Sequence, residues 1–226
     1  YTAEGLFDLP YEIEHEHIAH LAVDLPVPVG FWRSVGHSYN GFFMEGFLNE
    51  VAAAAKLDPL AMRRDLLKDH PRELKVLDTA AQAAGWGQPL APAADGAPRA
   101  RGIALHPSFG SVVAQVVEVS LKDGKPRVHR VVCAVDCGTV VNPAIVTQQM
   151  ESAIIFGLSA ALYSQIQIKD GQVVQSNFPD YPVLKMAETP VIETHIVPST
   201  AEPTGVGEVG VPPIAPAVAH AVAQLT

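Results

Sequence analysis

The stretch SVVAQVVEVSLKDGKPRVHRVVCAV, residues 111–135, decides the fold. Its first half belongs to a longer apolar segment from Ile103 to Leu121, and a second β-branched run extends from Val128 to Val135. Between the two runs, KDGK carries an Asp-Gly pair, which favours a tight hairpin turn because both residues tolerate positive φ. The sequence therefore predicts a long antiparallel hairpin at the centre of the chain.

Helices are predicted before this hairpin. The first begins near Tyr39, where apolar residues recur at spacings of three and four and would line one helix face. These residues are Phe43, Phe47, Val51 and Ala54. Asp58–Lys68 is the second, because Asp-Pro supplies an N-cap and a proline at the first helical position. Pro71–Gly85 is the third, opened by proline and closed by glycine.

A fourth helix is expected after the hairpin, with Asn142 as N-cap and Pro143 at its first position. Its inner face would carry Ile154, Ile155 and Leu158, with small residues around them. A second hairpin at 169–171 and two short strands, 183–186 and 191–197, follow. Together these elements indicate an α+β fold with mixed, largely antiparallel sheets and packed helices. The domain spans 1–226, with a sub-boundary in the Pro/Ala/Gly linker 86–100.

Composition limits the class of protein. Hydrophobic residues make up 48% of the chain, so it can bury a substantial core, and a net charge of −9 argues against nucleic acid or an anionic membrane as partner. Apolar stretches such as Ala153–Tyr163 are shorter than the roughly 20 residues that cross a bilayer, so a soluble, non-spanning chain is expected. Because it opens with Tyr1 and no signal peptide, it is interpreted as a piece of a longer precursor.

The cysteines and an N-terminal histidine patch have no clear metal spacing. Cys133 and Cys137 would face the same side of a strand about 13 Å apart, too far to pair, and are interpreted as buried structural thiols. The patch EIEHEHIAH contains three histidines, and a metal site and an edge segment facing water both fit it. The histidines are His15, His17 and His20.

One carboxylate in AEPTGVGEVGVPPIAPAVAHAV, residues 201–222, stands out. Glycines at 205, 207 and 210 free the backbone and admit a ligand, and Pro212 or Pro213 begins a helix whose N–H groups can hold an anion. Valines flank Glu208, so its pKa should rise towards the range of a general base. The alternative is a glycine-rich turn with Glu208 in water.

Six motif blocks, in order along nearly the whole chain, resemble the molybdenum-binding subunit of the xanthine oxidase family. They are WRSVGHSYNGFFMEGF, RGIALHPSFGSVVAQVVEV, DCGTVVNP followed by QMES, FGLSAAL, QSNFPDYPVLKM and PTGVGE. The most similar branch is that of the bacterial isoquinoline 1-oxidoreductase beta subunits and related aldehyde dehydrogenases. The chain matches the C-terminal part of a subunit about three times longer.

The resemblance implies a molybdenum hydroxylase that oxidises an aldehyde or an aromatic N-heterocycle. Glu208 would be the base that takes a proton from a molybdenum-bound hydroxyl, after which the oxygen attacks carbon and a hydride passes to the sulfido ligand. The cofactor would be molybdopterin or its cytosine dinucleotide form, with no side chain ligating the metal directly. Electrons would pass to [2Fe–2S] clusters on a partner subunit.

Further site residues follow from the resemblance. The loop 33–38, including Arg33, Ser34 and Gly36, would lie against the metal's ligands, although Arg33 also fits a surface ion pair. Trp32 would wall an aromatic substrate pocket or pack in the core. Gln149 would contact the pterin or lie on a helix surface. Gly205 and Gly207 would bind the cofactor, and Ser152 and Val209 depart from the usual Gly and Pro.

Asp180 and Tyr181 are expected to be structural, near the rim of the site, and His106 to be a core histidine or a neighbour of the cofactor. The rest of the molybdenum subunit and an iron–sulfur subunit are the expected partners, because further pterin loops and a cluster motif are missing here. A bacterial protein of the periplasm or cytoplasm is expected, with the periplasm favoured. Two alternatives are a non-catalytic assembly module and a nucleotide-phosphate binder, the latter without the usual lysine and spacing.

Overall fold

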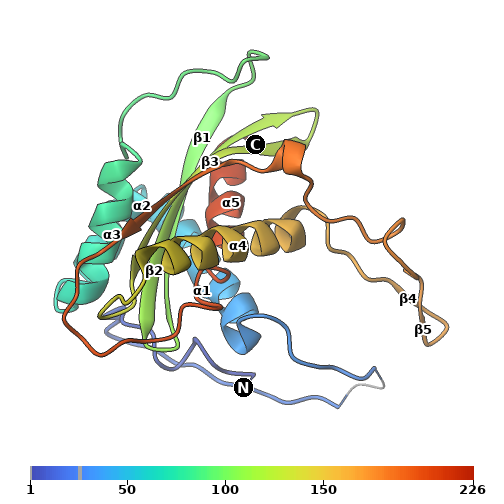
Figure 1. Cartoon of the computed structure of the whole chain (residues 1–226), viewed down its shortest axis with the longest axis horizontal. Coiled ribbons are helices and arrows are strands. Elements are labelled where there is room, and N and C mark those ends of the chain that lie inside the picture. The colour runs from blue at the N-terminus through green and yellow to red at the C-terminus, as the bar shows by residue number, and fades with distance from the viewer. Residues whose placement is uncertain (1, 25–26) are drawn as a thin grey trace.

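A four-stranded mixed sheet forms the centre of the computed structural model, which describes residues 2–24 and 27–226. Its strands are β1 (Arg99–Ser108), β2 (Ser111–Lys122), β3 (Lys125–Asp136) and β6 (Val191–Ile196), in the order β1-β2-β3-β6. The first three are antiparallel, whereas β6 is parallel to β3. The predicted α+β class, with a largely antiparallel sheet, is confirmed (Figure 1).

The central hairpin is confirmed, but the segment before it holds one strand more than the sequence predicted. Asp123 and Gly124 join β2 to β3 with φ of 49° and 72°, as an Asp-Gly turn requires. The segment Ile103–Leu121 is not continuous, because Phe109 and Gly110 make a second tight turn with φ of 51° and 78°. The hairpin is therefore part of a three-stranded meander with two tight turns, and β1 begins at Arg99, inside the predicted linker.

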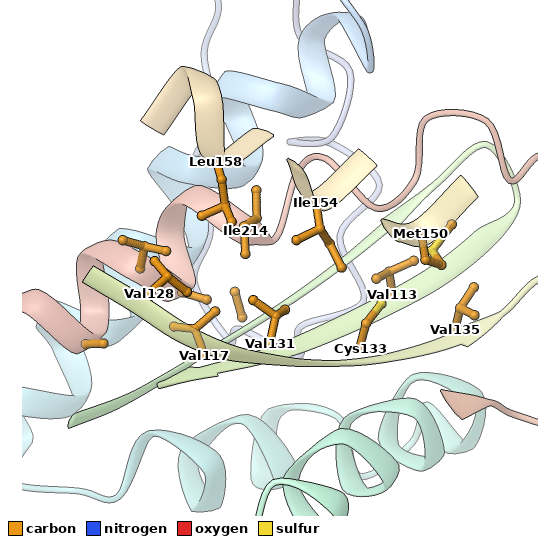
Figure 2. Packing of buried hydrophobic residues seen from close by; sticks show 14 of the residues in the cluster. Val113, Val117, Val128, Val131, Cys133, Val135, Met150, Ile154, Leu158 and Ile214 are labelled. Atoms are coloured by element: carbon orange, nitrogen blue, oxygen red, sulfur yellow. The ribbon is translucent and has the colours of Figure 1, made fainter. Parts of the chain in front are cut away.

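Both faces of the sheet are covered, so alternate residues of one strand enter two different cores. On β2, Val113 and Val117 belong to the core beneath the C-terminal helices, whereas Val112 and Val116 belong to the other core. Figure 2 shows the first core, where sheet residues point towards Met150, Ile154, Leu158 and Ile214. Because strands buried on both faces need apolar residues at every position, β2 is a nearly continuous apolar run.

Five α-helices surround the sheet in the described part of the chain. They are α1 (Val35–Ala55), α2 (Pro59–Leu66), α3 (Pro71–Ala83), α4 (Pro143–Leu162) and α5 (Ile214–Ala223). The helices α4 and α5 cover one face and α3 the other, while α1 contacts α2, α5 and β1 (Figure 1). The predicted caps are confirmed, since Asn142 accepts from the amides of Ala144 and Ile145 and Asp58 accepts from the amide of Ala61.

The first helix is confirmed, and its predicted apolar stripe lies on the side away from the sheet. Phe43 and Phe47 are each 60% exposed and Val51 is 38% exposed. The face turned to the protein is instead largely polar, with Glu45 1% exposed beside a buried Arg63. Hydrophobic periodicity located the helix, but its apolar stripe faces outward, because buried polar side chains occupy the inner side.

Smaller differences concern element ends. The predicted strand 183–186 is absent, and a short 3₁₀ turn, Met186–Glu188, stands beside it. The predicted hairpin at 169–171 is present as β4 (Ile168–Lys169) and β5 (Gln172–Val173). Ile155 is only half-buried, whereas its neighbour Ile154 is fully buried.

Helix α4 is longer than the apolar stretch on which the expectation of a soluble chain rested. At 20 residues it is the one helix in the described part of the chain whose length and composition would allow it to cross a membrane. Its inner residues Met150, Ile154 and Leu158 pack against the sheet in this structure (Figure 2).

Candidate functional site

The loop that carries Glu208 runs from β6 to α5 and is fixed to two turns of the sheet. The amide of Thr204 donates to the carbonyl of Cys137 at 3.0 Å, and the hydroxyl of Ser111 donates to the carbonyl of Gly205 at 2.7 Å. Gly138, with φ of 74°, lies so close to this loop that an added Cβ would overlap the carbonyl oxygen of Glu202. The sheet turns therefore set the path of the loop.

The glycines of this loop differ from the prediction in their backbone conformation. None of Gly205, Gly207 and Gly210 has a positive φ. Gly210 is needed for close packing, because an added Cβ would be 2.9 Å from the Cβ of Ala153 on α4. Gly207 faces open space, because an added Cβ would have no described atom within 4 Å apart from those of Gly207 itself and its two chain neighbours. Only Gly207 thus leaves room where a ligand could approach.

Ser34 holds Glu208 through two hydrogen bonds. Its amide donates to Oε1 of Glu208 at 2.9 Å, and its hydroxyl donates to the carbonyl of Glu208 at 2.7 Å. Within the described residues Oε2 has no hydrogen-bond partner. Ser34 has φ of 75° and Val35 has φ of 41°, a left-handed pair that is costly for residues with a Cβ and is kept only where the surroundings fix it.

The surroundings of Glu208 are less apolar than its valine neighbours suggested. The side chain is half-buried, and Val209 and Val211 turn into the core, where they are 0% and 3% exposed. Val209 and Val211 therefore point into the core, whereas the carboxylate of Glu208 does not. The carboxylate lies at the surface of the core, held by a polar neighbour, rather than in an apolar cage.

Arg33 ties the loop to α4. Its guanidinium donates to the carbonyl of Gly207, to the hydroxyl of Ser152 at 3.1 Å and to Oε1 of Gln149 at 3.2 Å. It also lies over the ring of Phe156, 5.6 Å from the centroid. Burial lowers the pKa of Arg33 and the carboxylate of Glu208 opposes that shift, but an arginine stays charged in proteins.

The structure thus gathers most of the predicted site residues. Arg33, Ser34, Gln149, Gly207 and Glu208 form one cluster from three distant parts of the sequence. Sequence reasoning noted Ser152 only as a departure from the family pattern and missed Phe156. The helical spacing of residues 149, 152 and 156 on α4 was the signal that could have placed all three on one side of that helix.

Trp32 and Gly36 belong to an apolar groove beside this cluster. The groove has a volume of about 770 Å³ and lies between the start of α1 and the small residues of α4, Gly157, Ala160 and Ala161. The rings of Trp32 and Phe156 approach with centroids 4.7 Å apart. Glu208 does not line this groove, so the groove and the carboxylate are neighbours rather than one pocket.

The remaining candidates lie elsewhere. Asp180 caps its own turn by accepting from the amides of Ser176 and Asn177, as a structural residue would. In the described residues no cluster of three or more His, Cys, Asp or Glu side chains could hold a metal ion, and the side chain of His15 is 91% exposed.

Both cysteines are buried and unpaired. Burial raises the pKa of Cys133 to about 12 and also raises that of Cys137. These thiols are therefore poor nucleophiles, as expected of structural cysteines.

Comparison with known proteins identifies relatives over nearly the whole chain. Residues 70–190 match the family model of the molybdopterin cofactor-binding domain. The chain is 35% identical to the beta subunit of isoquinoline 1-oxidoreductase from Brevundimonas diminuta over 96% of this chain and 28% of that protein. It is 32% identical to a nicotinate dehydrogenase subunit from Pseudomonas putida over 96% of this chain and 20% of that protein.

A solved structure supports the fold. The aldehyde oxidoreductase from Desulfovibrio gigas matches 87% of this chain and 39% of its own chain with a TM-score of 0.65 at 11% identity. The chain spans less than a third of the length of the two curated relatives.

Proposed function

The chain belongs to the molybdopterin cofactor-binding domain family, and we propose that it is the part of a molybdenum hydroxylase that supplies the general base, Glu208. The observation that carries this proposal is the fixed carboxylate. Ser34 holds Oε1 and the peptide carbonyl of Glu208, whereas Oε2 has no partner in the described chain. A base needs one oxygen oriented and the other available for a proton.

The residues around Glu208 fit a cofactor of this kind. Oε1 of Gln149 accepts from Arg33, whereas its Nε2 donates to no atom of the described chain. An amide with a free donor suits the edge of a heterocycle. Gly207 leaves open space beside it. Gln149 and the loop 205–208 would therefore hold one side of molybdopterin or its cytosine dinucleotide form. When bound, the cofactor supplies the redox chemistry by accepting two electrons from the substrate.

In this proposal each side chain has a separate task. Oε2 of Glu208 accepts a proton from the oxygen nucleophile that attacks the substrate. Arg33 keeps the carbonyl of Gly207 and the side chain of Gln149 at a fixed separation, since its guanidinium bonds both. Ser34 orients the carboxylate. Electrons leave to [2Fe–2S] clusters on another subunit.

The substrate class is an aldehyde or an aromatic N-heterocycle. The relatives are named for isoquinoline, nicotinate and aldehydes. The groove beside Trp32 has an apolar lining and a volume within the range of small-molecule sites. Both features suit a planar apolar substrate approaching the site from α4.

The outer face of α1 supports the proposal that the rest of the molybdenum subunit packs there. Phe43 and Phe47 are each 60% exposed, and Val51, one turn further along the helix, is 38% exposed. Monomeric soluble proteins rarely expose large contiguous apolar patches. Because the curated relatives are several times longer than this chain, their remaining length offers a cover for this face.

Replacement of the base tests the proposal in the full-length complex. Glu208→Gln should keep the molybdenum content while turnover falls on the order of 10² or more, because removal of a general base costs at least that much. Glu202→Gln is the control, since Glu202 is an exposed carboxylate six residues earlier in the same loop.

Two outcomes would contradict the proposal, and each would have a different meaning. Wild-type turnover in Glu208→Gln would remove Glu208 from the chemistry. Absence of molybdenum from the native complex, with no oxidation of any aldehyde or heterocycle, would favour the non-catalytic assembly module.

A further inference from the structure

Two buried histidines meet beneath the loop that carries Glu208. Nδ1 of His37, on the first turn of α1, is 3.0 Å from Nε2 of His106, on β1. His37 is 5% exposed and His106 is 0% exposed. Gly5 closes the pair from the N-terminal segment, because an added Cβ there would be 2.7 Å from Nδ1 of His37. The function proposed above uses neither ring.

The pair is neutral, and its hydrogen bond has a preferred direction. Burial lowers the pKa of His106 to about 3 and also lowers that of His37, despite the nearby carboxylates of Glu4, Asp8 and Glu208. Nδ1 of His106 is buried and has no hydrogen-bond partner among the described residues. Because an unpartnered buried N–H is rarer than an unpartnered acceptor, we assign the proton to Nε2 of His106, which then donates to His37.

This pair is connected to both sides of the Glu208 loop. On one side, His37 lies three residues after Ser34, whose amide and hydroxyl bind Glu208. On the other, the ring of Phe109 meets His37 edge to face with centroids 5.0 Å apart, and the carbonyl of Phe109 accepts from the amide of Gly205 at 3.4 Å.

Arg33 and Ser34 tie this loop to α4 and to Glu208, and the histidine pair adds an anchor on the side of the sheet. Ser34 and Val35 are both left-handed, and no side chain caps the start of α1. Without an anchor the segment would relax to a conformation with negative φ. The amide of Ser34 would then turn away from Glu208. The hydrogen bond between α1 and β1 opposes that change, because it fixes the first turn of the helix to the sheet.

We propose that the His37–His106 pair is a positioning element, which holds Ser34 and Phe109 so that the Glu208 carboxylate keeps one orientation. The inference rests on the proposed role of Glu208 as base for its effect on turnover. Its effect on the loop is independent of that role. Both rings act through other residues, and neither touches substrate.

The test compares two substitutions of one residue in the full-length complex. His106→Phe keeps a ring but removes the hydrogen bond, whereas His106→Gln keeps a donor near the position of Nε2. His106→Phe should raise hydrogen exchange of the amides of Ser34 and Gly205 about tenfold or more. It should also lower kcat at least about tenfold with KM little changed, because small misplacements of a catalytic group are costly. His106→Gln should restore both to within about threefold.

His220→Phe is the matched control. His220 is another poorly exposed histidine, and its Nδ1 accepts from the amide of Ile103 at 3.2 Å, on the same strand but away from Glu208. Its replacement should lower stability without changing exchange at Ser34 or kcat. If His106→Phe does not fold, His37→Phe and His37→Asn test the same hydrogen bond by changing its partner on α1.

The outcomes separate this inference from the proposed function. Wild-type exchange at Ser34 and Gly205 in folded His106→Phe overturns the positioning role, even where Glu208→Gln is inactive. Faster exchange at both amides, with Glu208→Gln fully active, supports the positioning role and rejects the base. Equal effects of His106→Phe and His220→Phe on exchange and kcat would show a general loss of stability and overturn the inference.

Discussion

Glu45→Gln should be among the most destabilising single changes in this chain. Glu45 on α1 is 1% exposed and pairs with Arg63 on α2, which is 0% exposed. Oε2 accepts from Nε and Nη2 of Arg63 at 3.0 and 2.9 Å and from the amide of Leu105 at 2.8 Å. The hydroxyl of Tyr11 donates to Oε1 at 2.6 Å. One carboxylate thus joins the N-terminal segment, two helices and the sheet.

The magnitude follows from the charge that would be left behind. Glutamine removes the negative charge and leaves Arg63 buried without a counter-ion, which costs about 3–5 kcal/mol. Strand amides that exchange only through unfolding should therefore exchange faster by between about two and four orders of magnitude, since 1.36 kcal/mol is a factor of ten. Native-state hydrogen exchange of β1 to β3 in the full-length protein measures this directly.

Arg64→Gln is the control, because Arg64 follows Arg63 on α2 and also forms an ion pair. The pair Arg64–Asp78 has a similar distance of 2.7 Å, but its side chains are 49% and 44% exposed. Its loss should cost less than about 1 kcal/mol. Equal effects of Glu45→Gln and Arg64→Gln would refute the argument from burial. Replacement of Glu45 and Arg63 together by methionine should recover much of the loss, because no unpaired charge remains.

Two further predictions concern the packing of the Glu208 loop and the dependence of stability on pH below neutrality. Gly138→Ala should cost about 2–4 kcal/mol and speed exchange in the loop 201–208, because its Cβ would overlap the carbonyl oxygen of Glu202. Gly124→Ala, with φ of 72° and no neighbour within 4 Å, should cost only about 1 kcal/mol. Burial lowers the pKa of His220 from 6.5 to about 4, so stability should fall as pH drops through that interval, where the unfolded chain binds more protons. His220→Gln should flatten this pH dependence by up to about 3 kcal/mol in denaturant titrations, and an unchanged slope would contradict the assignment.

Local signals in the sequence were enough for most elements. Three dipeptides each favour one local backbone conformation, and the expected turn or helix start is present at each. They are Asp-Gly at 123–124, Asn-Pro at 142–143 and Asp-Pro at 58–59. The turn at Phe109 was missed because an aromatic residue with φ of 51° is not stabilised by its own chemistry. Its ring packs on His37, 72 residues earlier in the chain, and that contact has no local signature.

The inner face of α1 shows the same limit. A stripe of aromatic residues ordinarily marks the buried side of a helix. Here Glu45 and His37 are buried instead, because Arg63 and His106 supply partners from α2 and β1. A buried polar residue can be predicted only with its partner, and both partners lie on other elements. The aromatic stripe, with Phe43 and Phe47 exposed, thus lies outside the core of this chain.

The same reasoning explains why the residues of the candidate site could be predicted from the sequence but their geometry could not. The hydrogen bond from Ser34 to Glu208 joins positions 174 residues apart, so no motif contains both. What brings them together is the sheet, because β1 carries His106 and its turn carries Phe109, while β3 ends at the turn that holds the loop 201–205. A carboxylate oriented in this way depends on strand register, since a one-residue slip of β1 against β2 would turn His106 to the opposite face. The orientation of Glu208 is therefore a property of the meander, and changes in its two tight turns should alter the site before they unfold the chain.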